Sequence, residues 1–118
     1  MEDLCPHFEP VRALLRENDW PGLVEGTSYG TPGLKVRGKF LARLREPDVL
    51  VMTCDFNEKE ILMQMAPEVY FQTDHYKNWP GILIRVSKID PEQLKLHIEK
   101  AWRTLATQKM IAEYESRG

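Results

Sequence analysis

The chain has 118 residues, of which 42% are hydrophobic and 29% are charged, and its formal net charge is −2 at pH 7. A chain of this length and composition is typical of a water-soluble domain with one hydrophobic core that needs no disulfides. The sequence contains no apolar run near the ~20 residues of a membrane span, and its charge excludes a protein that is basic over its whole surface. We therefore expect one domain over residues 1–118, no membrane association, and any polyanion site confined to one region.

The cellular compartment is predicted from the first residues and the cysteines. Glu2 and Asp3 are acidic, and the beginning of the sequence lacks the basic and apolar regions of a signal peptide. Cys5 and Cys54 are too few for a disulfide framework. These features predict a cytoplasmic protein with free thiols.

The first predicted element is a helix over residues 7–18, because Phe8, Val11, Leu14 and Leu15 recur at helical spacing. Four strands should follow, over residues 24–29, 33–37, 39–45 and 49–54. The connections between these strands are short, which makes neighbouring strands antiparallel.

The second half of the chain contains two more predicted helices and two strands. A short helix over residues 58–65 should be capped by Asn57, and strands should follow over residues 69–73 and 82–86. The last helix, over residues 91–108, has Asp90 as its cap and Pro91 in its first position. We expect the polar tail after this helix to fray or to extend it.

The strand over residues 39–45 indicates which face of the sheet should be buried against the core. Side chains alternate between the two faces of a strand, so Phe40 and Leu44 should point to the core while Arg43 points away. A two-residue turn at Arg37-Gly38 would place Val36 on the face of Lys39, whereas an odd loop or a bulge would align it with Phe40. We expect the odd loop.

The sequence thus predicts an α+β fold, one antiparallel sheet with helices packed on one face and a basic open face. The residues expected in the core are Val36, Phe40, Leu44, Ile84, Leu94, Ile98 and Trp102.

The open face carries the strongest charge signal in the sequence. Residues 35–45 include five basic and no acidic side chains, and residues 76–88 include three basic and none acidic. Lysine and arginine at strand spacing suit contacts with nucleic-acid phosphates. The predicted contact residues are Lys35, Arg37, Lys39, Arg43, Lys77 and Arg85. The alternative is a solvated face whose charges prevent edge pairing.

Two further segments could line a pocket for a small ligand or a partner protein. Gly30-Thr31-Pro32-Gly33 lies before the basic run, and residues 73–80 have the sequence TDHYKNWP. The first segment is more typical of a turn, and the commoner use of aromatic side chains such as those of the second is to close the sheet against a helix. The candidate pocket residues are Tyr29, Thr31, His75, Tyr76 and Trp79.

Catalytic and metal-binding patterns are weak. Asp74 and His75 are adjacent, so on a strand they would point in opposite directions, and Cys54 could approach His75 only through the fold. His7 and His97 are expected on helix surfaces at no ligand spacing. We expect no catalytic residues, no metal and no cofactor, and therefore a protein that is not an enzyme.

Several motifs, in order, resemble the YjbR/MmcQ-like family. They are Ser-Tyr followed by Gly-Thr-Pro, then KVRGKFLARL, CDFNEKE, TDHYKNWPGILIRV and a closing helix with Ala-Trp, spread from Leu14 to Lys109. The resemblance implies a CyaY-like (frataxin-like) α+β fold in a small bacterial cytoplasmic protein. Members are often labelled DNA-binding. The resemblance carries over no catalytic residues and no iron chemistry.

The leading hypothesis is a monomer or weak dimer that binds DNA through the basic hairpin. The alternative is a non-catalytic domain with a pocket between the Gly-Thr-Pro loop and residues 76–79.

Overall fold

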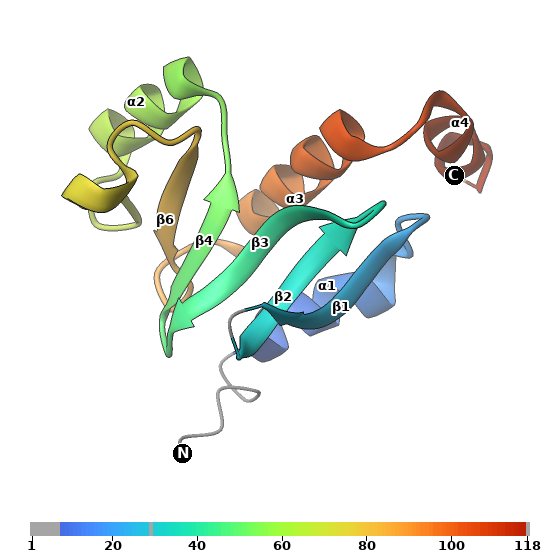
Figure 1. Ribbon diagram of the computed structural model, residues 1–118, viewed down its shortest axis with the longest axis horizontal. Coiled ribbons are helices and arrows are strands. Elements are labelled where there is room, and N and C mark those ends of the chain that lie inside the picture. Colours follow the sequence, from blue (N-terminus) through green and yellow to red (C-terminus); the bar gives the residue numbers. More distant parts are fainter. Residues whose placement is uncertain (1–7, 29, 118) are drawn as a thin grey trace.

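The computed structural model describes residues 8–28 and 30–117, and its centre is a six-stranded sheet (Figure 1). The sheet order is β1-β2-β3-β4-β6-β5, and every pairing between these strands is antiparallel. The strands are β1 (Leu23–Ser28), β2 (Thr31–Val36), β3 (Lys39–Glu46), β4 (Val49–Thr53), β5 (Tyr70–Phe71) and β6 (Gly81–Arg85). The predicted single antiparallel sheet is confirmed.

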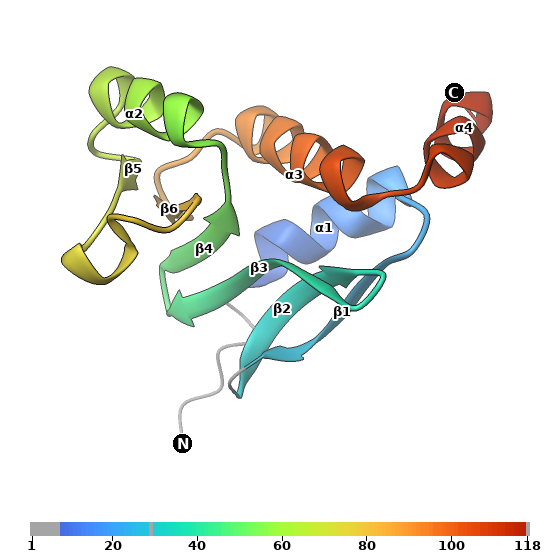
Figure 2. The same cartoon turned by 45° about the horizontal axis from the view of Figure 1, so that its top comes forward.

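Helices α1 (Glu9–Asn18), α2 (Phe56–Met65) and α3 (Pro91–Leu105) lie on one side of the sheet, and α4 (Gln108–Arg117) follows beyond the end of α3 (Figure 2). A short 3-10 helix, η2 (Asp74–Tyr76), lies in the connection between β5 and β6. The helices and the sheet together make the predicted α+β class. In the part of the chain that the structure describes, no helix is both long and apolar enough to cross a membrane.

The predicted helix ends are partly correct. Asp90 caps α3 and accepts a hydrogen bond from the Glu92 amide, with Pro91 in the first turn, as expected. The α2 cap is Asp55 rather than Asn57, because the Asp55 carboxylate accepts the Asn57 amide at 2.7 Å. That bond starts the helix two residues before the predicted position.

The tail neither frays nor extends α3, so both expectations for it are wrong. Ala106 is extended and ends α3, and the Thr107 hydroxyl then accepts the Met110 amide at 3.2 Å. This bond starts a separate helix, α4, whose Ile111 and Tyr114 pack against the core. The tail forms a helix of its own because it has an apolar side that the core can bury.

The β2–β3 hairpin closes through a two-residue turn. Arg37 and Gly38 both have positive φ, 55° and 75°, and Val36 pairs with Lys39. Turns of this kind match the natural twist of hairpin strands, and glycine adopts such a φ without strain. The predicted odd loop at this position is therefore wrong.

A β-bulge inside β3 produces the irregularity that was expected at the turn. Phe40 pairs with Lys35 and Ala42 pairs with Leu34, which leaves Leu41 as an extra residue between them. Leu41 and Ala42 are both fully buried on the helix side, whereas Phe40 lies on the opposite face. The prediction of Phe40 in the main core is wrong, because the bulge at Leu41 shifts the alternation of side chains along β3.

The main core lies between the sheet and the helices. Trp102 is fully buried at its centre and donates its indole N–H to the Pro21 carbonyl oxygen at 2.7 Å. Apart from Phe40, every predicted core residue is buried there: Val36, Leu44, Ile84, Leu94, Ile98 and Trp102.

The face of the sheet opposite the helices, here called the outer face, is only partly open. Val49, Val51 and Leu83 are buried on it. Four aromatic side chains pack over them: Phe40, Phe71, Tyr76 and Trp79. The outer face therefore carries a small apolar cluster next to its basic residues.

Candidate functional site

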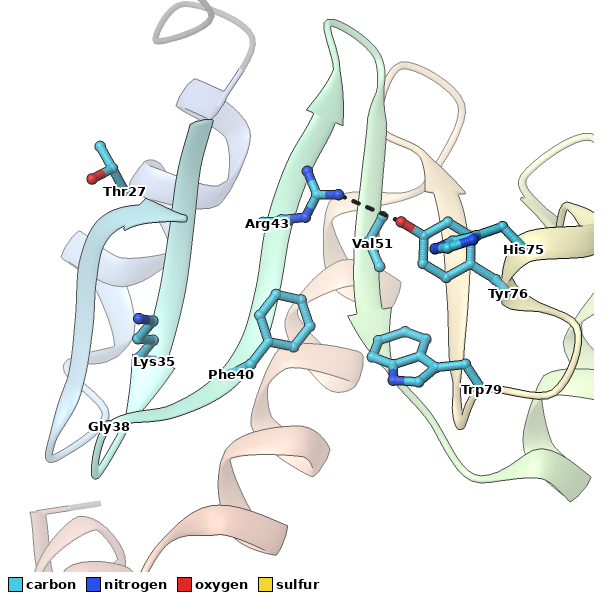
Figure 3. A pocket seen from close by; sticks show the side chains of 9 residues that line it. All are labelled: Thr27, Lys35, Gly38, Phe40, Arg43, Val51, His75, Tyr76 and Trp79. Carbon is cyan, nitrogen blue, oxygen red and sulfur yellow. Dashed lines mark hydrogen bonds between the residues drawn. The ribbon is translucent and has the colours of Figure 1, made fainter. Parts of the chain in front are cut away.

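A cleft of about 850 Å³ lies on the outer face between the β2–β3 hairpin and residues 74–79, here called the aromatic turn (Figure 3). The hairpin supplies basic side chains and the ring of Phe40, the aromatic turn supplies the other rings, and β4 forms the floor. The lining residues are Thr27, Lys35, Gly38, Phe40, Arg43, Val51, His75, Tyr76 and Trp79. The cleft thus brings together two sets of residues that the sequence suggested for two separate sites.

The basic side of the cleft is built by the register of the hairpin. Lys35 lies opposite Phe40 and Arg43 lies opposite Gly33, so both cations share the outer face. The Arg43 guanidinium donates to the Tyr76 hydroxyl at 3.4 Å, across the cleft (Figure 3). This contact links the hairpin to the aromatic turn and leaves a positive charge beside the ring.

Aromatic rings from both sides of the cleft pack against one another in tilted and edge-to-face contacts. The centroids of Tyr76 and Trp79 are 5.6 Å apart with planes inclined by 65°, and those of Phe40 and Trp79 are 5.9 Å apart at 60°. His75 adds a perpendicular contact to Tyr76 at 4.8 Å. These geometries are favourable between aromatic rings and hold each ring in place. All three of Phe40, Tyr76 and Trp79 remain half-buried, so each keeps some surface at the cleft.

Lys59 of α2 holds the aromatic turn from behind. Its side chain is buried, and its ammonium donates to the carbonyl oxygens of Tyr76 at 2.9 Å and Trp79 at 2.8 Å. Burial lowers the pKa of Lys59, since a charged amine is less stable away from water. Sequence reasoning missed this residue because a lysine in a helix usually points into solvent.

Gly81 gives Trp79 its place against the sheet. A Cβ atom at Gly81 would lie 1.7 Å from the Trp79 ring, far inside contact distance. Glycine is therefore required at the start of β6 for the indole to pack where it does. The Trp79-Pro80-Gly81 sequence is thus part of the construction of the cleft.

Not every predicted site residue reaches the cleft. The Arg37 guanidinium donates to the Leu105 carbonyl oxygen at 3.4 Å, at the end of α3, and so points away from the outer face. Arg85 lies over the Phe71 ring at 4.1 Å from its centroid. Lys39 and Lys77 are exposed, but neither lines the cleft.

The Gly-Thr-Pro loop contributes less than expected. Thr31 is half-buried in β2 and does not line the cleft, and Tyr29 lies outside the described residues. The side opposite the aromatic turn is instead provided by the hairpin, including Phe40. Sequence reasoning missed Phe40 because a bulge leaves only a weak signal, here three consecutive apolar residues, 40–42, inside a strand.

The candidate nucleophile does not meet the candidate base. Cys54 lines a different cavity, between α2, α3 and the sheet, whereas His75 lies at the outer cleft. Burial, with a smaller effect of the Glu58 carboxylate, raises the pKa of Cys54 to about 11, so its thiol is protonated at neutral pH. Among residues 8–28 and 30–117, no three His, Cys, Asp or Glu side chains are grouped so as to hold a metal ion. The cleft therefore offers stacking surfaces and positive charge to a ligand.

The comparisons with known proteins identify a family. The YjbR family model matches residues 18–104, and the chain belongs to this family. It is 30% identical over 64 residues to an uncharacterised protein of Mycobacterium bovis and to uncharacterised proteins of two Mycobacterium tuberculosis strains. The match covers 54% of this chain and 50% of each relative, so the chain spans about half the length of the curated relatives it matches. No solved structure matches, and the frataxin-like label stays a prediction.

Proposed function

We propose that the outer cleft binds single-stranded nucleic acid, and that the protein acts by binding rather than by catalysis. The observation that carries this proposal is the meeting of two cations, Lys35 and Arg43, with the rings of Phe40, Tyr76 and Trp79 in one cleft. Rings stack on unpaired bases and cations contact the adjoining phosphates, and this pair of contacts is the usual basis of single-strand binding.

A single strand fits this geometry better than a duplex does. In a duplex the faces of the bases are stacked inside, so rings that line a cleft cannot reach them. A duplex would also need a continuous row of cations along its backbone. Arg37 is directed to α3 and Arg85 covers Phe71, so the six predicted contact residues do not form such a row.

The same cleft supports a second candidate function, the binding of a small planar anion. Its volume of about 850 Å³ is within the usual range for pockets that hold small molecules. A ligand with an aromatic ring and a carboxylate or phosphate would use the same residues. The length of the preferred ligand separates the two candidates.

The test is a binding titration against single-stranded DNA, single-stranded RNA, duplex DNA and a mononucleotide at several salt concentrations. We expect weak binding of single strands, with a dissociation constant of about 10⁻⁴ to 10⁻⁶ M at physiological salt. With two phosphate contacts, the slope of log affinity against log salt should be about −1.4. Tyr76→Leu and Lys35→Ala should each weaken binding, whereas the control Lys109→Ala alters an exposed lysine on α4, away from the cleft.

Three results would contradict the proposal. Tighter binding of duplex DNA than of single strands would favour a surface that contacts phosphates alone. Equal effects of Lys35→Ala and Lys109→Ala on affinity would show that the ligand does not bind in the cleft. Binding of the mononucleotide without any gain for longer strands would favour the small-anion candidate.

A further inference from the structure

A second cavity, of about 450 Å³, lies on the helix side of the sheet. Its walls come from α2 and α3 and its floor from β4 and β6, elements that adjoin one another in Figure 2. The apolar lining includes Met52, Leu62, Ile82, Ile84, Ala101 and Leu105, together with Pro80 at its edge towards the aromatic turn. Met52 faces this cavity while its neighbour Val51 faces the outer cleft, so the two hollows lie on opposite faces of the sheet. The second cavity is therefore independent of the proposed nucleic-acid site.

The polar groups of this cavity are joined in a chain of contacts. The Lys100 ammonium donates to Glu58 Oε2, and the other carboxylate oxygen, Glu58 Oε1, is 3.9 Å from His97 Nδ1. That distance is too long for a hydrogen bond. The second nitrogen of His97, Nε2, is hydrogen-bonded to the Tyr70 hydroxyl at 2.6 Å. Glu58 Oε1 thus has room for a hydrogen-bond donor from a ligand.

The charges around this cavity do not balance. Asp55 and Glu58 are two carboxylates, and Lys100 is the single ammonium among the lining residues. His97 adds no charge at neutral pH because burial lowers its pKa, and Cys54 adds none because burial raises the pKa of its thiol to about 11. The charge in excess belongs to Asp55, which is exposed and accepts the Asn57 amide as the α2 cap. The position that suits a cationic donor is therefore Glu58 Oε1, in a lining whose carboxylates outnumber its ammonium groups.

We propose that this cavity binds a small organic cation, an amine with an apolar or aromatic body. The ammonium group would donate to Glu58 Oε1, and the body would lie against Leu62 and Leu105, the half-buried apolar residues of the lining. The volume is within the range of known ligand pockets, in which an apolar lining gives affinity and a few polar groups fix the orientation. A carboxylate ligand is disfavoured because it would lie beside the carboxylates of Asp55 and Glu58, and because the ammonium of Lys100 is already paired with Glu58.

Three probe molecules that share a phenyl body and differ in their polar end group test this proposal on the wild-type protein. They are 2-phenylethylamine, the neutral 2-phenylethanol and the anionic 3-phenylpropanoate, each titrated by calorimetry and by two-dimensional NMR of the backbone amides. We expect the amine to bind about tenfold or more tightly than the alcohol, since a charge-assisted hydrogen bond is lost with the alcohol. The shifted resonances should belong to α2, α3 and the end of β4.

Two variants locate the binding. Glu58→Gln should weaken amine binding about tenfold or more, and the matched control Glu60→Gln, an exposed residue of the same helix, should leave it unchanged. Thr104→Phe should abolish binding of the amine by filling the cavity next to Lys100. Melting curves show whether each variant is folded. If a variant does not fold, the comparison of the three probes on the wild-type protein still tests the proposal.

The proposal is overturned if none of the probes binds at millimolar concentration, or if the anion binds as well as the amine. It is also overturned if the resonances that move belong to the outer cleft, around Tyr76 and Trp79. Equal affinity of the Glu58→Gln and Glu60→Gln variants for the amine would show that Glu58 does not contact the ligand.

Discussion

The ammonium of Lys59 is 2.8 Å from the carbonyl oxygen of Trp79, although the Lys59 side chain is almost completely buried. In the described part of the chain no carboxylate pairs with this lysine, and backbone carbonyls accept its hydrogen bonds. Burying an ammonium in this way is costly, and the cost is offset by charge-assisted hydrogen bonds to the turn. The contact therefore connects α2, on the helix side, to the aromatic turn that borders the outer cleft.

The first prediction concerns this contact. Lys59→Met keeps an apolar stem of similar length and removes both donors, so the carbonyl oxygens of Tyr76 and Trp79 lose their partner. We expect a loss of about 1–3 kcal/mol in the free energy of unfolding, measured by chemical denaturation. Backbone amides of residues 76–81 should also exchange faster with solvent. Lys88→Met changes an exposed lysine and is the matched control.

A variant with unchanged stability and unchanged exchange in this segment would show that Lys59 does not hold the aromatic turn. If the turn loosens, nucleic-acid binding should weaken together with it, because Trp79 then loses its fixed position.

The second prediction concerns the main core. Trp102 is fully buried and donates to Pro21 O, so Trp102→Ala should cost about 3–5 kcal/mol through the cavity it leaves. Trp102→Phe keeps most of the packing and should cost less, mainly the lost hydrogen bond, at about 1–3 kcal/mol. Denaturant titrations of both variants measure the two contributions. Equal losses in the two variants would mean that ring volume is unimportant at this position.

The sequence was sufficient for the parts of the fold that follow local rules. The α3 helix could be predicted because Asp90 and Pro91 mark its start and its apolar residues recur at helical spacing. The inward direction of Ile84 followed from strand alternation. These signals lie within a few residues of one another, so no knowledge of the tertiary structure is needed to read them.

The composition of the cleft could be predicted only in part. The bulge at Leu41 depends on how β3 meets both β2 and the core, and simple alternation therefore placed Phe40 on the wrong face. The direction of Arg37 depends on the end of α3, which is distant in sequence. His97 was expected on a helix surface, but it is half-buried because β5 brings Tyr70 to it. Each of these errors comes from a contact between distant segments.

The third prediction concerns Cys54. Because its pKa is about 11 rather than 9.0, the fraction of thiolate near pH 8 should be about a hundredfold smaller than for an ordinary cysteine. Alkylation of Cys54 by iodoacetamide should therefore be slow in the folded protein and fast after unfolding. The measurement uses a Cys5→Ser background so that a single thiol reacts. A folded-state rate equal to that of a free cysteine would contradict the raised pKa.

The last prediction concerns His97 and the response of stability to acid. Burial lowers the pKa of His97 below its usual value of 6.5, and this effect exceeds the opposite influence of Glu58. The unfolded chain therefore takes up a proton at this histidine at a higher pH than the folded protein does. Stability from the neutral imidazole is complete above pH 6.5 and decreases as the pH falls from 6.5 towards the lower folded-state pKa.

An NMR titration of the imidazole C–H resonances measures this pKa directly, with the signal of His97 identified by its absence in His97→Gln. We expect a midpoint below 6.5. Urea unfolding at several pH values should then show that the wild type loses more stability than His97→Gln between neutral pH and the measured midpoint. A midpoint at or above 6.5 would mean that the attraction of Glu58 outweighs burial. A midpoint above 7 would further mean that the histidine is positively charged next to Glu58 at neutral pH, and the cavity on the helix side would then no longer favour a cation.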